Sequence, residues 1–317
     1  MTVARALLAL LMFAIAAVAI VSFIAVSEVA RRQAQLEAER TIAATTYGRI
    51  EYQSWGAGPA VLVIHGAGGG FDQGRLLAES LGGEGVRWIS VSRFGYLGSD
   101  LPEDASVPAQ ALAFKELLDQ LQIETVHILA MSGGVPPALK FAELFPNRTG
   151  QMVLLSSAPF TPYGPDVDDR PIPTWMYSAL LGNDIVYWTL KRVARNAVEQ
   201  AFDARAELRT DRIPAEEAFI RDLVDTFLPA SKRVKGVLNE AAAVDPSLTY
   251  RLDQIDSHVL VVHAADDRLN PFAIGETLAA RIRGSEFLGL ERGGHLLLGH
   301  HAELRERISK HLVESQE

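Results

Sequence analysis

The sequence predicts an α/β fold, a mainly parallel doubly wound sheet with a helical cap insertion, preceded by one N-terminal transmembrane helix. Short apolar runs rich in β-branched residues alternate with helical patterns, which is typical of buried parallel strands covered by helices. The runs Val61 to His65 and Val259 to His263 show this best. Between them, residues 159–250 contain proline-rich loops and helical patterns without a convincing strand. We therefore expect these residues to form a cap over the site.

Composition excludes several classes of protein. The 317 residues are 48% hydrophobic, enough to bury one large core or two modest ones. The net charge of −9 is spread over mixed charges with no basic patch, so we expect no nucleic-acid partner. The chain has no cysteine, which excludes disulfides, a thiolate nucleophile and cysteine metal sites.

The N-terminal run Ala6 to Val26 carries no charge. As a helix it would be about 30 Å long, which matches the hydrocarbon core of a bilayer. We expect an uncleaved single-pass anchor that contacts the lipid bilayer through residues 6–26. A cleaved signal peptide, with Ala25-x-Ser27 as its cleavage site, and a buried helix are the alternatives. Arginines and glutamates beside the run leave the membrane side of the body open.

Changes in composition divide the chain into five parts. Residues 1–27 form the tail and anchor, and the charged residues 28–46 form a juxtamembrane linker or stalk. The core occupies 47–158 and 251–317, with the cap at 159–250 between them. Expected strands are Arg49 to Trp55, Val61 to His65, Trp88 to Ser92, Val126 to Met131, Gln151 to Ser157, Val259 to His263 and Glu286 to Leu290. Expected helices are Pro108 to Leu121, the run from Gly133, Ile185 to Phe202, Ala215 to Leu228, Lys232 to Val244, Pro271 to Ile282 and His301 to Val313.

The strand at Val126 to Met131 ends abruptly at Ser132, and a helical pattern starts almost at once. A serine at a sharp strand-to-helix turn is typical of a nucleophile elbow, which requires small residues two positions away on either side. Here they are Ala130, where glycine is usual, and Gly134. The following helix would direct free N–H groups at the site, which suits a developing oxyanion. A close-packed turn without chemistry is the alternative.

Polar residues follow two later strands. A serine hydroxyl is a poor nucleophile at neutral pH and needs a base, which in turn needs a group to orient it. Asp266 and Asp267 come directly after the strand at Val259 to His263, and His295 follows the last expected strand. Because parallel strands end at the same edge of a sheet, we expect these side chains to meet there.

With these residues in view, the sequence resembles the α/β-hydrolase family over about residues 47–313. The motifs that carry the resemblance are the glycine-rich turn at His65-Gly66, the elbow at Ala130 to Gly134, the acid turn at Ala264 to Pro271, and Gly293-Gly294-His295. The resemblance implies Ser132 as nucleophile, His295 as general base and acid, and Asp267 as orienting acid. Asp266 stays open as the alternative acid.

The resemblance further implies an oxyanion hole formed by the N–H groups of Ala67 and Gly133, with no metal and no organic cofactor. It implies a serine hydrolase that cleaves an ester-type bond of a small or medium apolar acyl substrate through an acyl-enzyme. The alternatives are carbon–carbon bond, thioester or lactone hydrolysis, acyl transfer, and a non-catalytic membrane-tethered binding module. The last is motivated by the alanine at position 130.

The remaining histidines and the cap aromatics have plainer interpretations. We expect structural roles for His127, His258 and His263, and we expect His65 to brace the oxyanion loop. His295, His300 and His301 have no carboxylate at ligand spacing, so we expect no metal site. The cap aromatics could be ordinary packing or the lining of an apolar acyl pocket; they include Trp175, Tyr177 and Trp188.

Overall fold

The computed structural model describes residues 2–159, 182–211, 213–242 and 248–313. Its centre is an eight-stranded sheet in the order β1-β2-β4-β3-β5-β6-β7-β8. The pairs β1–β2 and β2–β4 are antiparallel, and the strands from β4 to β8 run parallel. The strands are β1 (Thr41–Thr45), β2 (Gly48–Gly56), β3 (Ala60–Ile64), β4 (Arg87–Val91), β5 (Val126–Met131), β6 (Thr149–Leu155), β7 (Val259–Ala264) and β8 (Glu286–Leu290). The predicted α/β fold with a mainly parallel sheet is confirmed.

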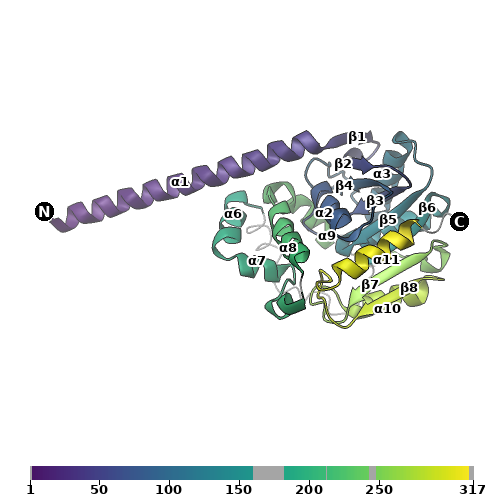
Figure 1. Cartoon of the computed structure of the whole chain (residues 1–317). Coiled ribbons are helices and arrows are strands. Elements are labelled where there is room, and N and C mark those ends of the chain that lie inside the picture. Colours follow the sequence, from purple (N-terminus) through teal and green to yellow (C-terminus); the bar gives the residue numbers. More distant parts are fainter. Residues whose placement is uncertain (1, 160–181, 212, 243–247, 314–317) are drawn as a thin grey trace.

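Helices cover both faces of this sheet (Figure 1). The helices of the described residues are α1 (Thr2–Glu39), α2 (Phe71–Leu81), α3 (Val107–Gln120), α4 (Val135–Leu144), α6 (Asp184–Val193), α7 (Arg195–Ala201), α8 (Pro214–Thr226), α9 (Val234–Ala242), α10 (Phe272–Arg281) and α11 (His301–Val313). Alternate residues of β3 divide the core, because successive side chains of a strand point to opposite faces. Leu62 and Ile64 pack with α3, α4 and α10, whereas Val61 and Val63 pack with α2 and α11. Helix α2 was not among the predicted elements.

The described part of the insertion between β6 and β7 is helical, as expected, and consists of α6 to α9. Of the cap aromatics, Trp175 and Tyr177 lie outside the described residues. Trp188 is buried, and its Nε1 donates a hydrogen bond to Glu28 of α1 at 2.8 Å. Trp188 therefore packs between the cap and the N-terminal helix, in one cluster with Ala25 and Val29 of α1.

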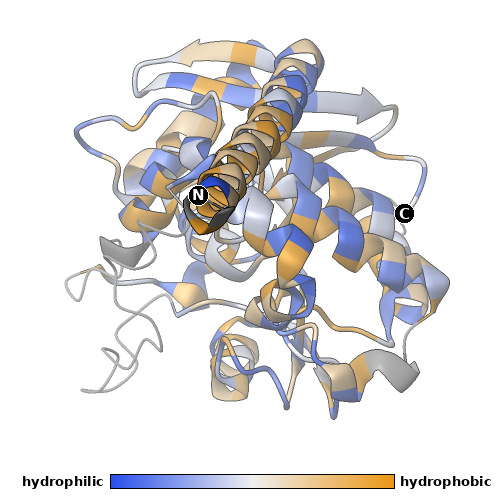
Figure 2. Cartoon of the chain, turned by 90° about the vertical axis from the view of Figure 1, so that its left-hand side faces the viewer, coloured by the Kyte–Doolittle hydropathy of each residue, from blue (hydrophilic) through white to orange (hydrophobic). Residues whose placement is uncertain are grey.

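Helix α1 extends far from the body (Figure 1), and among the described residues it is the helix that is long and apolar enough to cross a membrane. Its outer turns are predominantly hydrophobic (Figure 2) and mostly exposed up to Ile24. Ala25 and Val29 are instead buried in a cluster with aromatic and aliphatic residues of the cap. Helix α1 thus has an exposed apolar part up to Ile24, which continues without a break into a part that packs against the cap from Ala25 on.

The prediction of a linker or stalk over residues 28–46 does not hold for its last residues. The helix stops at Glu39, and residues Thr41–Thr45 form the edge strand β1, paired antiparallel with β2. Ala43 is buried in the core under this edge while its neighbours are exposed. This strand is too short, and its alternation of apolar and polar residues too weak, to be recognised from the sequence. Pairing with β2 determines its conformation.

Candidate active site

Ser132 lies at the sharp turn between β5 and α4. Its backbone φ is 53°, a strained value for a residue with a side chain. A Cβ at Gly134 would lie 2.3 Å from the carbonyl oxygen of Ile64, so glycine is required there. Gly66 approaches from the loop after β3, and a Cβ on it would lie 3.3 Å from that of Ser132. The turn has the geometry of the predicted elbow, and Ala130 is accommodated in the core.

His295 and Asp267 are joined directly. His295 Nδ1 lies 2.9 Å from Asp267 Oδ2, and the other carboxylate oxygen accepts the backbone N–H groups of Leu269 and Asn270 at 2.8 and 2.9 Å. Burial alone would raise the pKa of Asp267, but the charge of His295 and hydrogen bonds from His263, His295 and Asn270 lower it below its ordinary value. Asp267 is therefore ionised at neutral pH and orients the imidazole with Nδ1–H toward itself.

Ser132 is connected to this pair through Asn270. The Asn270 side-chain amide donates to Ser132 Oγ at 3.4 Å and to the carbonyl of Ser156 at 2.9 Å, while its backbone N–H donates to Asp267. Within the described part of the chain, no hydrogen bond joins Ser132 Oγ to His295. The three predicted residues thus belong to one hydrogen-bonded network, in which Asn270 links the serine hydroxyl to the Asp267–His295 pair. Catalytic hydrogen bonds are often long before substrate binds.

The adjacent side chains of Asp266 and Asp267 have different partners. Asp266 Oδ1 accepts the backbone N–H of Gly294 at 2.8 Å, and Oδ2 pairs with Arg205 at 2.8 Å. Asp266 thus supports the loop that carries His295 and does not contact its ring. Asp203, from the cap side, also supports this loop by accepting the backbone N–H of His295 at 2.8 Å. Burial raises the pKa of Asp203 above its ordinary value.

His65 holds the loop that approaches the elbow, as expected from the sequence. Its Nδ1 lies 2.6 Å from the carbonyl oxygen of Gly66, and its Nε2 accepts the backbone N–H of Arg93 at 3.1 Å. Burial and the charge of Arg93 lower the pKa of His65 well below its ordinary value, so the ring is neutral. Ala67 follows in this loop and is exposed, and Gly133 is the second residue of the helical turn Ser132–Gly134.

Sequence reasoning missed several residues around the site. His263 Nε2 lies 3.2 Å from Asp267 Oδ2, although we expected a structural role for it; its place at the end of β7, four residues before the acid, was the available signal. Asn270 lies in the acid turn at Ala264 to Pro271, but the sequence predicts no role for it. Arg93, Tyr96 and Glu240 gather beside Gly133. Glu240 comes from cap helix α9, which the sequence predicted, but no pattern in the sequence indicates that this side chain reaches the elbow.

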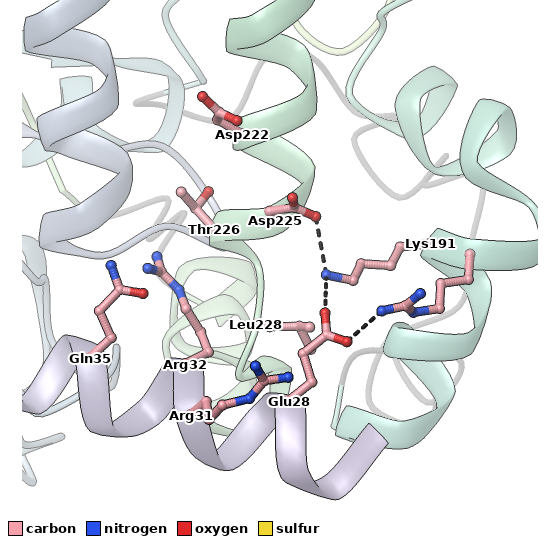
Figure 3. Close-up of a pocket in the computed structure, with 10 residues that line it drawn as sticks. Glu28, Arg31, Arg32, Gln35, Lys191, Asp222, Asp225, Thr226 and Leu228 are labelled. Carbon is pink, nitrogen blue, oxygen red and sulfur yellow. Dashed lines mark hydrogen bonds and ion pairs between the residues drawn. The ribbon is translucent and has the colours of Figure 1, made fainter. Parts of the chain in front are cut away.

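Two cavities lie near the cap. One, of about 120 Å³, is lined by Gly133, Arg93, Tyr96 and Glu240, and is next to the elbow. A larger one, of about 550 Å³, lies between α1, α6 and α8 and is lined mostly by charged residues, including Glu28, Lys191 and Asp225 (Figure 3). Of the predicted catalytic and oxyanion-hole residues, Gly133 lines the smaller cavity and none lines the larger one, so we place the substrate side of the elbow at the smaller cavity. No group of three or more His, Asp or Glu side chains suited to a metal occurs among the described residues.

Known proteins resemble this chain over most of its length. A model of the alpha/beta hydrolase family matches residues 61–307. A 2-hydroxy-6-oxononadienedioate/2-hydroxy-6-oxononatrienedioate hydrolase from Paraburkholderia phymatum is 28% identical over 266 residues, covering 80% of this chain and 87% of that protein. The solved structure of an alpha/beta hydrolase fold protein from Nakamurella multipartita is 27% identical, has a TM-score of 0.74, and covers 86% of this chain and 98% of its own. An esterase from Exiguobacterium antarcticum shares the fold, with a TM-score of 0.63 at 22% identity and coverages of 86% and 98%.

Proposed function

Since the chain belongs to the alpha/beta hydrolase family, we propose that it is a serine hydrolase that cleaves an ester-type bond of a small or medium acyl substrate through an acyl-enzyme. One observation carries the proposal. A strained serine at an elbow is linked through Asn270 to an Asp267–His295 pair with the correct imidazole orientation. Nucleophile, base and orienting acid are the parts that activate a serine hydroxyl.

The proposed mechanism uses these residues in turn. Substrate binding exchanges the Asn270–Ser132 hydrogen bond for one between Ser132 Oγ and His295 Nε2. Ser132 Oγ attacks the carbonyl carbon while His295 takes its proton, and the ionised Asp267 stabilises the resulting imidazolium. The oxyanion accepts the N–H groups of Gly133 and Ala67, a contribution typically worth about 10²–10³ in turnover per donor. His295 then protonates the leaving group, and water releases the acyl group by the reverse steps.

Carbon–carbon bond hydrolysis is the second candidate, and the Paraburkholderia relative favours it. The compound in that protein's name carries hydroxyl, ketone, alkene and carboxylate groups but no ester, so its hydrolysis breaks a carbon–carbon bond beside the ketone. The same serine, histidine and aspartate can perform both reactions. A ketone with an adjacent dienoate and an ester of equal length, offered to the same preparation, distinguish them.

The experiment that tests the hydrolase is active-site labelling with a fluorophosphonate. We expect the full-length protein to be labelled and Ser132→Ala not to be. Ser157→Ala is the matched control, because Ser157 is buried nearby and bonds only the carbonyl of Ala158 among its described partners. Absence of labelling in the well-folded protein would favour the non-catalytic binding module.

We also propose that residues 6–26 form an uncleaved membrane anchor. The support is the burial of Ala25 and Val29 against the cap, since cleavage after Ser27 would remove Ala25 from this packing. Alkaline extraction of membranes, combined with the N-terminal mass of the mature protein, tests this. A mature chain that begins at residue 28, or that is extracted by alkali, would contradict it.

A further inference from the structure

We propose that Arg93 and Tyr96 form a carboxylate-binding subsite beside Ser132, which Glu240 of the cap fills in this structure and a carboxylate of the substrate fills during turnover. This inference rests on the proposed hydrolase function. It narrows the substrate class to anionic acyl compounds, in place of the fully apolar acyl group expected from the sequence.

Arg93 is the centre of the subsite. Its side chain is only 6% exposed, and one guanidinium nitrogen donates both to the carbonyl of Gly66, at 3.0 Å, and to Glu240 Oε1. Its Nε has no hydrogen-bond partner among the described residues. A buried guanidinium is costly without an anion, and Glu240 is the one carboxylate paired with it in the described chain. Whatever displaces Glu240 must therefore supply negative charge.

Tyr96 supplies the second donor. Its hydroxyl donates to the same oxygen, Glu240 Oε1, and its ring lies 5.1 Å from the Arg93 guanidinium carbon. The Tyr96 ring also packs edge-on against His65, which holds it beside the oxyanion loop. Two donors that converge on one oxygen, one of them charged, are suited to bind a carboxylate.

The position of Glu240 shows why it must move. A Cβ at Gly133 would lie 2.5 Å from Glu240 Oε2, so this carboxylate stands directly over the residue that follows the nucleophile. The cavity left beside it is about 120 Å³, whereas sites for small molecules usually hold about 300–1,000 Å³. Glu240 lies on α9 of the cap, near its C-terminal end, so it can withdraw without a change in the sheet.

Selectivity follows from this exchange. A substrate with a carboxylate at the right distance takes the place of Glu240 and leaves Arg93 paired. A neutral substrate of the same shape either competes with Glu240 for space or leaves a buried positive charge without a partner. The site should therefore favour the anionic member of a matched pair.

The test compares two esters with acyl chains of equal length, mono-p-nitrophenyl glutarate and p-nitrophenyl valerate, on the full-length protein in detergent. We expect a higher kcat/KM for the glutarate ester, and we expect Arg93→Gln to lower the glutarate-to-valerate ratio by about 10- to 100-fold, the range for hydrogen bonds to charged groups. Arg93→Lys should recover part of the ratio. Lys235→Gln, an exposed charge on the same helix as Glu240, should leave it unchanged.

A second measurement does not depend on turnover or on a variant of Arg93. Free glutarate should protect Ser132 from fluorophosphonate labelling, and it should do so at lower concentration in Glu240→Ala. An equal or lower kcat/KM for glutarate in the wild type, or no protection in either protein, would overturn the subsite while labelling of Ser132 kept the hydrolase intact. No labelling and no hydrolysis of either ester would reject both.

Discussion

Asp266 and Asp267 are adjacent in the sequence, yet their carboxylates bind different parts of the molecule. Asp267 contacts the ring of His295, whereas Asp266 contacts the backbone of Gly294 and the guanidinium of Arg205. The sequence could not separate the two, because the choice depends on how the turn after β7 winds. That winding is defined by the hydrogen bonds from Leu269 and Asn270 to Asp267, which no spacing rule reports.

The two aspartates therefore predict a contrast. Asp267→Asn should reduce kcat by about 10⁴, because the amide favours the wrong imidazole tautomer and cannot stabilise the imidazolium. Asp266→Asn should cost far less, since an amide oxygen still accepts the Gly294 N–H. Hydrolysis of one p-nitrophenyl ester by both variants checks this, with circular dichroism as the control for folding. Equal losses would mean that the acid is misassigned.

Gly134 predicts a steric effect at the elbow. Gly134→Ala places a methyl group 2.3 Å from the carbonyl oxygen of Ile64, so we expect a loss of about 1–3 kcal/mol in the free energy of unfolding and reduced activity per folded molecule. Gly85→Ala is the matched control. Its φ of 81° costs about 1–2 kcal/mol of backbone strain, but open space surrounds it and the site is untouched. Chemical denaturation and active-site titration separate the two effects.

At the scale of elements, one buried carboxylate holds three parts of the chain together. Asp72 of α2 pairs with Arg233 at 2.9 Å and with Arg32 of α1 at 2.5 Å. Arg233 immediately precedes α9, and its side chain is fully buried. The same ion cluster thus joins the core to the cap and to the N-terminal helix. Its members lie 40 and 161 residues from Asp72, a separation that local patterns in the sequence cannot reveal.

This cluster predicts a large loss of stability. Asp72→Asn leaves the buried Arg233 charge without compensation, which typically costs about 3–5 kcal/mol. Glu79→Gln on the same helix is the control, because the Arg75–Glu79 pair is 41% and 50% exposed and is worth about 0–1 kcal/mol. The free energies of unfolding from urea titration give the comparison. Similar free energies of unfolding for both variants would show that the buried Asp72–Arg233 pair contributes little to stability.

The elements that the sequence predicted are those whose own pattern is strong. The boundaries of apolar strands such as β3 and β7 and of the amphipathic α11 were predicted to within a residue or two. The hydrophobic pattern of each segment indicates by itself whether both faces or one stripe is buried. By contrast, β1 was missed because its conformation comes from its partner β2, and α2 because glycines and polar residues interrupt its pattern. The positions of Ser132 and His295 after predicted strands could likewise be read from local pattern, whereas the position of Glu240 depends on how the cap packs on the core.

At the scale of the whole molecule, stability should depend on pH through His311. This side chain of α11 lies 3.0 Å from the carbonyl oxygen of Met152 in β6, and burial together with the nearby His258 lowers its pKa from 6.5 to about 4. A lowered histidine pKa means that the folded state prefers the neutral ring. Its contribution is complete above about pH 6.5 and is lost as the pH falls toward 4.

The wild type should therefore lose stability over this window more steeply than His311→Gln, by at most about 1.4 kcal/mol per pH unit, the value for one proton. Urea titrations at pH 7, 6, 5 and 4 measure the slopes. His300→Gln, at a partly exposed histidine immediately before α11, controls for the loss of a histidine. Parallel curves for wild type and His311→Gln would contradict the assignment.

Helix α1 runs unbroken into the body, and a single residue, Arg40, separates it from β1. No hinge intervenes, and the docked half of the helix contacts both cap and core. With residues 6–26 as the proposed anchor, the body would not rotate freely relative to the membrane. Its distance from the lipid and its orientation would instead be set by the helix. Molecules dissolved in the headgroup layer would then reach the entrance by lateral diffusion, and their local concentration would depend on partitioning more than on their bulk concentration.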